Sequence, residues 1–176
     1  MSLIVPCALS GSFLFGELRT MAYKPFLIKK DVAYGDYGID TAVHSSDEWN
    51  VYVTSLPFRP FPDMKDLPSN DWKDEDGDDE YLPDRPAMQS YEMEVSFAYI
   101  GMAADAPAKI RSFLQYLAFG GYFSIYSQYT GIGRKKVRYV SYDDDALSID
   151  DSGKEIVTFK VTLKVNDPVT NIALEK

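Results

Sequence analysis

The chain has 176 residues, 45% of them hydrophobic and 26% charged, which is enough apolar material for the core of one domain. Its net charge of −9 argues against a general nucleic-acid-binding protein, which needs a basic surface. The single cysteine, Cys7, excludes an internal disulfide framework, and the single histidine, His44, excludes a metal site built from several histidines. The aromatic content of 14% favours strands, and no apolar run reaches the roughly 20 residues that span a membrane.

Residues 1–20 are apolar and rich in small side chains, as in a secretory signal peptide. However, no lysine or arginine precedes the apolar stretch, and Pro6 interrupts it. A second start-like sequence begins at Met21. Three further interpretations of residues 1–20 follow: an upstream extension, an arm that pairs with a neighbouring subunit, or a wrongly chosen start.

Two segments show the alternation of apolar and polar residues that is typical of a half-buried strand, Tyr91–Tyr99 and Val157–Val165. The polar face of the first is acidic and that of the second is basic, so the two strands would pair with complementary charge if they were adjacent. Weaker strands are predicted at Phe26–Lys30, Asn50–Ser55, Tyr122–Ser127 and Lys136–Tyr142.

A long acidic, proline-rich connection covers residues 57–88. The segment from Asp63 to Asp84 has a net charge of −8, so the rest of the chain sums to only −1. Ordering a loop of this length costs more than its few apolar side chains return. We therefore expect a partner to order the loop, or the loop to stay mobile in solvent. The candidate subunit-contact residues are Phe58, Phe61, Trp72, Asp76, Asp79 and Tyr81.

One helix is predicted between an N-cap at Asp105, with Pro107 in the first turn, and a stop at Gly120–Gly121. Its apolar stripe is the candidate core of the helix and consists of Ile110, Phe113, Leu114 and Leu117. Because helices and strands do not alternate along the chain, a parallel sheet is not expected. The sequence predicts a mainly β fold, an antiparallel sandwich or barrel with one helix packed on it.

Several motifs that could carry chemistry are better explained as structural. An EF-hand placed with Gly77 at position 6 fails at both ends, since Trp72 and Pro83 fall where acids are required, which leaves only loose cation binding in an acidic loop. His44, beside two serines, is interpreted as an exposed loop residue, because a triad needs a third group placed in space. No catalytic residue, metal ligand or cofactor site is predicted.

Four further segments are interpreted as turns or as a charged cluster. The acidic runs Asp143–Asp145 and Asp150–Gly153 are predicted to be turns between strands. The segment Gly131–Arg134 lacks the third glycine and the following helix of a phosphate loop, so it is predicted to be a turn. The basic cluster Arg134–Arg138 is expected to pair with acids of the same or a neighbouring subunit rather than with nucleic acid.

The order of segments from Met21 to about Asn171 resembles the tail-tube fold of long-tailed bacteriophages, especially distal tail proteins and prophage tail components. The chain differs from the family pattern in its longer acidic loop, in residues 1–20, and in lacking a large C-terminal second domain. Tail-tube, distal-tail and tail-completion roles therefore all stay open. The resemblance lies in the segments Asp36–Ile39, Gly77–Tyr81, Tyr91–Val95, Phe113–Leu117, Val157–Leu163 and Asp167–Pro168.

The resemblance implies a non-enzymatic virion structural protein. Such subunits form rings, usually hexameric homo-oligomers, whose sheets surround a lumen that conducts DNA without specific binding. It further implies contacts with other tail proteins, no membrane, assembly in the bacterial host cytoplasm and a place in the virion tail. The residues fit this reading, because a nearly neutral β body with exposed strand edges needs partners, and an acidic surface toward a lumen would repel DNA.

Residues 21–176 are expected to form a single domain with the loop at 57–88, preceded by the extension 1–20. Two other classes of function remain open. A surface or secreted β-sandwich could use its 13 tyrosines to bind glycan or peptide, which would require an export signal in residues 1–20. A hydrolytic enzyme with an acid pair would require a pocket in which carboxylates converge.

Overall fold

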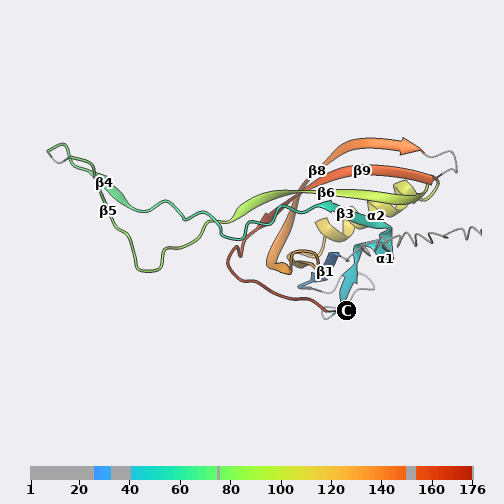
Figure 1. Cartoon of the computed structure of the whole chain (residues 1–176), viewed down its shortest axis with the longest axis horizontal. Helices are drawn as coiled ribbons and strands as arrows, with labels where there is room; N and C mark the ends of the chain where they lie inside the picture. The colour runs from blue at the N-terminus through green and yellow to red at the C-terminus, as the bar shows by residue number, and fades with distance from the viewer. Residues whose placement is uncertain (1–25, 33–40, 75, 150–153, 176) are drawn as a thin grey trace, which may run out of the picture.

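The computed structural model describes residues 26–32, 41–74, 76–149 and 154–175. Within them the chain forms nine strands and two helices, and a projecting arm extends to one side (Figure 1). In chain order the elements are β1 (Phe26–Lys30), β2 (Ala42–His44), α1 (Ser45–Trp49), β3 (Val51–Ser55), β4 (Ser69–Asp71), β5 (Asp78–Glu80), β6 (Tyr91–Met102), α2 (Ala106–Ala118), β7 (Phe123–Ser127), β8 (Ile132–Ile149) and β9 (Lys154–Val165).

Seven strands form one antiparallel sheet in the order β2-β1-β7-β8-β9-β6-β3, and β4 and β5 form a separate two-stranded sheet. The long strand β8 joins the two halves of the large sheet. It pairs with β7 at its start, where Ile132 lies opposite Ser127, and with β9 from Val137 onward. The mainly β, antiparallel fold class predicted from the sequence is confirmed.

The sheet curls back on itself, because strands far apart in its order meet across the core. The ring of Phe26 on β1 lies 6.0 Å from that of Phe97 on β6. Helix α2 adds a third ring to this cluster. The centre of the Phe113 ring lies 5.1 Å from that of Phe97 and 6.3 Å from that of Phe159. These aromatic side chains are fully buried. Their burial supplies a large share of the driving force for folding the body.

The strongest strand predictions pair with each other as the charge pattern indicated. Strands β6 and β9 run antiparallel along their whole length, with Glu92 opposite Lys164. Across this pair, the amine of Lys164 lies 3.6 Å from the Glu92 carboxylate, and the amine of Lys160 lies 2.9 Å from that of Glu94. The alternating apolar side chains of Tyr91–Tyr99 and Val157–Val165 face the core.

Helix α2 lies where the sequence placed it, with Asp105 as its N-cap residue and a proline in its first turn. The Asp105 side chain makes no capping hydrogen bond, although its backbone carbonyl accepts from the amide of Lys109. Past the helix end, Gly120 and Gly121 both have positive φ angles, 82° and 79°, which glycine adopts without steric cost.

A second, five-residue helix, α1, contradicts the expectation of a single helix. It connects β2 to β3, the two terminal strands of the large sheet among the described residues. Trp49 at its end packs on α2, with its ring 4.9 Å from Tyr116. His44, interpreted as an exposed loop residue, instead ends β2 with a side chain that is only 15% exposed. The sequence analysis missed α1 because a helix of five mostly polar residues shows no apolar stripe.

Strand β8 corrects two turn predictions. Ile132–Arg134 and the backbone of Asp143–Asp145 lie inside the strand, not in turns. A shift in register against β9 lies at Asp144, and another against β7 lies between Arg134 and Val137. Predictions that concern residues 1–20, Asp36–Ile39 and Asp150–Gly153 fall outside the described residues.

Candidate functional site: an acidic arm beside the body

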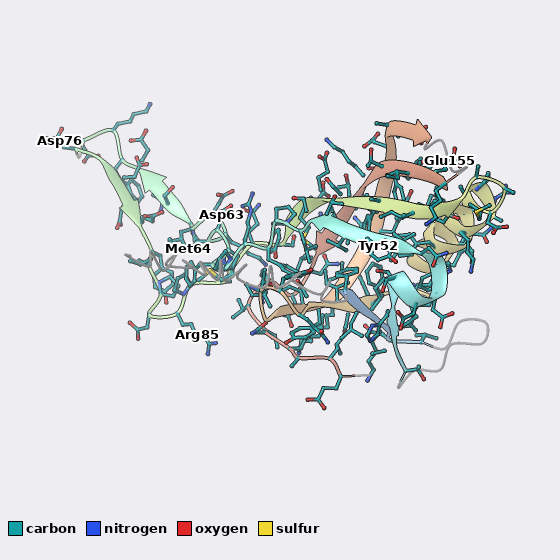
Figure 2. All side chains as sticks on the ribbon, turned by 45° about the vertical axis from the view of Figure 1, so that its right-hand side comes forward. Tyr52, Asp63, Met64, Asp76, Arg85 and Glu155 are labelled. Atoms are coloured by element: carbon teal, nitrogen blue, oxygen red, sulfur yellow. The ribbon has the colours of Figure 1, made fainter. Side chains whose placement is uncertain are left out.

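The connection between β3 and β6 is an arm, residues 57–88, that projects away from the body (Figure 1). Figure 2 shows Asp76 at its far end, and Asp63 and Met64 nearer the body. Its small sheet, β4 with β5, was missed by the sequence analysis, because Ser69–Asp71 and Asp78–Glu80 are polar and exposed throughout. The long acidic loop is therefore partly a two-stranded ribbon.

Backbone hydrogen bonds join the two limbs of the arm at several levels. Near the body, the amide of Gln89 donates to the carbonyl of Asp63 at 2.8 Å, and that of Lys65 donates to Ala87 at 2.9 Å. Further out, Asn70 in β4 lies opposite Asp79 in β5. This pairing satisfies backbone groups but buries little apolar surface, so it specifies a shape without contributing much stability.

The base of the arm is fixed to the body through Arg59. Its guanidinium lies 5.5 Å from the centre of the Tyr91 ring and forms an ion pair with Asp63. The Arg59 carbonyl accepts a hydrogen bond of 3.0 Å from the buried guanidinium of Arg134. Arg134 was predicted to belong to a basic cluster that pairs with acids; its buried guanidinium instead donates to backbone carbonyls and supports the arm. Phe58 packs against the core beside this contact.

Beyond the base, the predicted contact residues are exposed. Phe61 is 75% exposed, Trp72 51% and Tyr81 70%, and the neighbouring Leu82 is 65% exposed. Exposed apolar side chains gathered on one projecting element are typical of an interaction surface. The structure thus separates Phe58, which lies against the body, from the other aromatic side chains of the arm.

The predicted acidic contact residues, Asp76 and Asp79, are also exposed on the outer part of the arm. Across the described residues, no three His, Cys, Asp or Glu side chains are grouped so that they could share a metal ion. Nor is any described helix long and apolar enough to cross a bilayer. The arrangement of the outer arm offers apolar rings among carboxylates, which is suited to contact with another macromolecule.

A groove of about 620 Å³ lies where the arm meets the C-terminal segment, and the sequence analysis did not anticipate it. Its walls include Phe61 and Met88 of the arm and Val169 of the C-terminal segment. Burial alone would raise the pKa of Asp167, but hydrogen bonds from Thr170 and the nearby Lys135 amine hold it below its usual value. The ionised Asp167 carboxylate therefore holds the C-terminal segment in place through Thr170 and Lys135.

The four helix residues predicted as core divide into two groups. Phe113 and Leu117 are buried, whereas Ile110 and Leu114 are partly buried and pack against the edge of the core. Tyr116, which the stripe did not include, is also buried.

The end of α2 is held by a buried lysine. The Lys30 amine donates to the carbonyls of Phe119 at 2.6 Å and Leu117 at 3.4 Å. It also lies 5.0 Å from the centre of the Tyr116 ring and 4.9 Å from that of Phe123. A cation at the C-terminal end of a helix is favoured by the helix dipole. No sequence pattern marked Lys30, because lysine is seldom buried.

Comparison with solved structures shows a similar fold in a known protein. The fold is similar to the crystal structure of the SPP1 Dit (gp 19.1) protein, described as a paradigm of the hub adsorption apparatus in phages that infect Gram-positive bacteria. The identity is 15% and the TM-score 0.54, over 82% of this chain and 51% of the other, so the chain spans about half the length of that protein. No protein-family model and no curated protein match the sequence.

Proposed function

We propose that the protein is a structural subunit of a phage or prophage tail and that the acidic arm grips a neighbouring tail subunit. One observation carries this proposal: a fold shared with a phage adsorption-hub protein presents an arm with exposed aromatic side chains. The proposal leaves tail-tube, distal-tail and tail-completion roles open. In this proposal residues 21–176 form one domain and residues 1–20 an extension.

The arm has the features of a docking element. Burying Phe61, Trp72 and Tyr81 on a partner would contribute about 1.5–3 kcal/mol for each side chain, before the cost of ordering. The surrounding carboxylates would favour a partner surface with basic residues and disfavour wrong partners. Asp76 and Asp79 set this charge at the outer end of the arm.

A ring around a DNA-conducting lumen is the assembly that we propose, with a hexamer as the expected size. The outer face of β6, β9 and β8 is suited to passing DNA, since its acids and bases are nearly equal in number and therefore neither hold nor strongly repel a phosphate backbone. The acids are Glu92, Glu94 and Asp143, and the bases are Arg138, Lys154, Lys160 and Lys164.

The proposal is tested by assembly of the purified chain, followed by sedimentation and electron microscopy. We expect annular particles at high concentration. The variant Phe61→Ser/Trp72→Ser/Tyr81→Ser should remain folded but lose them. The matched control, Val32→Ser/Met102→Ser/Tyr122→Ser, removes exposed apolar side chains from the body and should still assemble.

Two results would contradict the proposal. One is a wild-type chain that stays monomeric at every concentration, which would favour a monomeric surface module that binds glycan or peptide. The other is an arm variant that assembles as well as the wild type, which would remove the arm from the contact.

A further inference from the structure

A second exposed apolar surface lies on the body, away from the arm. It is a groove of about 470 Å³ between α2 and β8, which we call the α2 groove. Ile110 and Leu114 form its helical wall, and Tyr139 and Tyr142 form its wall on β8. All four are partly buried and pack against the core, so the groove has a firm apolar floor. Its size is within the range of pockets that hold ligands.

The charges around the α2 groove are informative. Arg111 is its one charged lining residue among those described. On the β8 side, the hydroxyl of Tyr142 donates to the carboxylate of Asp144, and Asp143 precedes it. An acidic segment such as the arm of a second copy would bring its net charge of −6 toward these carboxylates. The groove is therefore better matched to an uncharged apolar segment.

The chain has one such segment. Residues 1–16 contain no charged side chain and no histidine, and eight of them are Leu, Ile, Val, Met or Phe. Left in water, this apolar surface would favour self-association, so it needs a cover. We propose that residues 3–15 of each chain dock into the α2 groove of the same chain.

The length of the connection permits this docking. Residues 17–25 lead into β1 and span at most about 30 Å when extended. The ring distances from Phe26 to Phe97 and from Phe97 to Phe113 place the Phe26 and Phe113 rings within about 11 Å of each other. Phe113 adjoins Leu114 of the groove wall on α2. The start of β1 is thus close enough to α2 for the segment to reach the groove, and the short tether gives it a high effective concentration there.

The single cysteine makes the proposal testable, because Cys7 lies in the middle of the docking segment. A second cysteine is introduced in the groove wall, as Gln115→Cys or as Ala118→Cys, at exposed positions of α2. The matched control is Ala108→Cys, exposed on the same helix but outside the groove lining. Each full-length variant is oxidised mildly at low concentration and separated on a non-reducing gel.

We expect at least one groove variant to form an intramolecular disulfide at least tenfold faster than the control. Equal rates in groove and control variants would overturn the proposal. A disulfide-linked dimer in place of the intramolecular bond would also overturn it, and would assign the groove to a second copy of the chain.

A second measurement does not depend on crosslinking. In the otherwise unchanged protein, Cys7 should react slowly with a water-soluble maleimide. Ala118→Arg places a charge in the groove at the end of α2, where the helix dipole favours it, and should raise the labelling rate several-fold. Ala108→Arg should not raise it. Rapid labelling of the parent protein, or equal rates in the two variants, would contradict the docking.

Discussion

The body buries most of its aromatic side chains, whereas the arm exposes most of its own. In the body, Phe97, Phe113 and Phe159 are fully buried and in ring contact with one another. In the arm, Phe61 and Tyr81 stand out into solvent on a ribbon held mainly by backbone hydrogen bonds. The comparison teaches that the body buries most of its aromatic side chains in its own core, whereas no described part of the chain covers the exposed rings of the outer arm.

The largest expected difference is between an aromatic side chain of the body and one of the arm. Phe113→Ala should lower the free energy of unfolding by about 3–5 kcal/mol, because it leaves a cavity among packed rings. Phe61→Ala should change it by less than about 0.5 kcal/mol. Urea denaturation measures both. A large loss of stability in Phe61→Ala would mean that the arm is part of the folding core.

The pH dependence of stability tests the buried cation of the body. Burial lowers the pKa of Lys30 to about 8, and Asp31 partly opposes this shift. Between pH 8 and the unfolded-state pKa of 10.5, the unfolded chain binds more protons, so the free energy of unfolding should rise with pH, by up to about 3 kcal/mol. Above pH 10, Tyr142, whose pKa burial and Asp144 raise to about 12, acts in the opposite direction.

The useful window for this test is therefore pH 8 to 10, measured by denaturant unfolding at each pH. Lys30→Met should remove the rise in stability. A wild-type protein whose stability stays flat across the window, or a variant that keeps the rise, would show that the amine of Lys30 is not the group responsible.

A smaller effect is expected where the C-terminal segment crosses β8. The Gly133 amide donates to the Asn171 side chain at 2.8 Å, and a β-carbon at Gly133 would collide with the backbone carbonyl of Ile172. Gly133→Ala should cost about 1–3 kcal/mol of stability in thermal unfolding. Removing residues 171–176 should abolish most of that cost. An equal cost in the intact and shortened chains would place the clash elsewhere.

The smallest effect concerns surface charge. Glu94→Gln breaks the exposed ion pair with Lys160 on the sheet and should cost about 0.2–1 kcal/mol, less at high salt. Asp79→Asn on the arm should leave stability unchanged in the same denaturation assay. A clear gain of stability in Asp79→Asn would show that like-charge repulsion in the arm strains the monomer.

The sequence predicted the parts of the fold whose pattern repeats over many residues. The alternation in β6 and β9 and the caps of α2 are local signals, and they gave the antiparallel class. The short elements β2 and α1 were missed because three and five residues show no period. Strand β8 was predicted too short, because Gly131–Arg134 and Asp143–Asp145 have turn-like composition that register shifts accommodate.

The sequence predicted which residues make up the arm, but not how the arm folds or how it is attached to the body. Charge and proline content marked residues 57–88, and the aromatic side chains there were identified. The role of Arg134 beneath Arg59 depends on a contact between residues 75 positions apart, which no local pattern records. The same is true of Lys30 at the end of α2, 87 and 89 positions from its acceptors.

The most direct test of the central claim is hydrogen exchange of the purified chain at low and high concentration. At low concentration the amides of residues 57–88 should exchange fast while those of β6 and β9 stay protected. At high concentration the arm should gain protection while β6 and β9 stay as protected as before. An arm as protected as the body in the monomer, or one that exchanges equally fast at every concentration, would contradict the account.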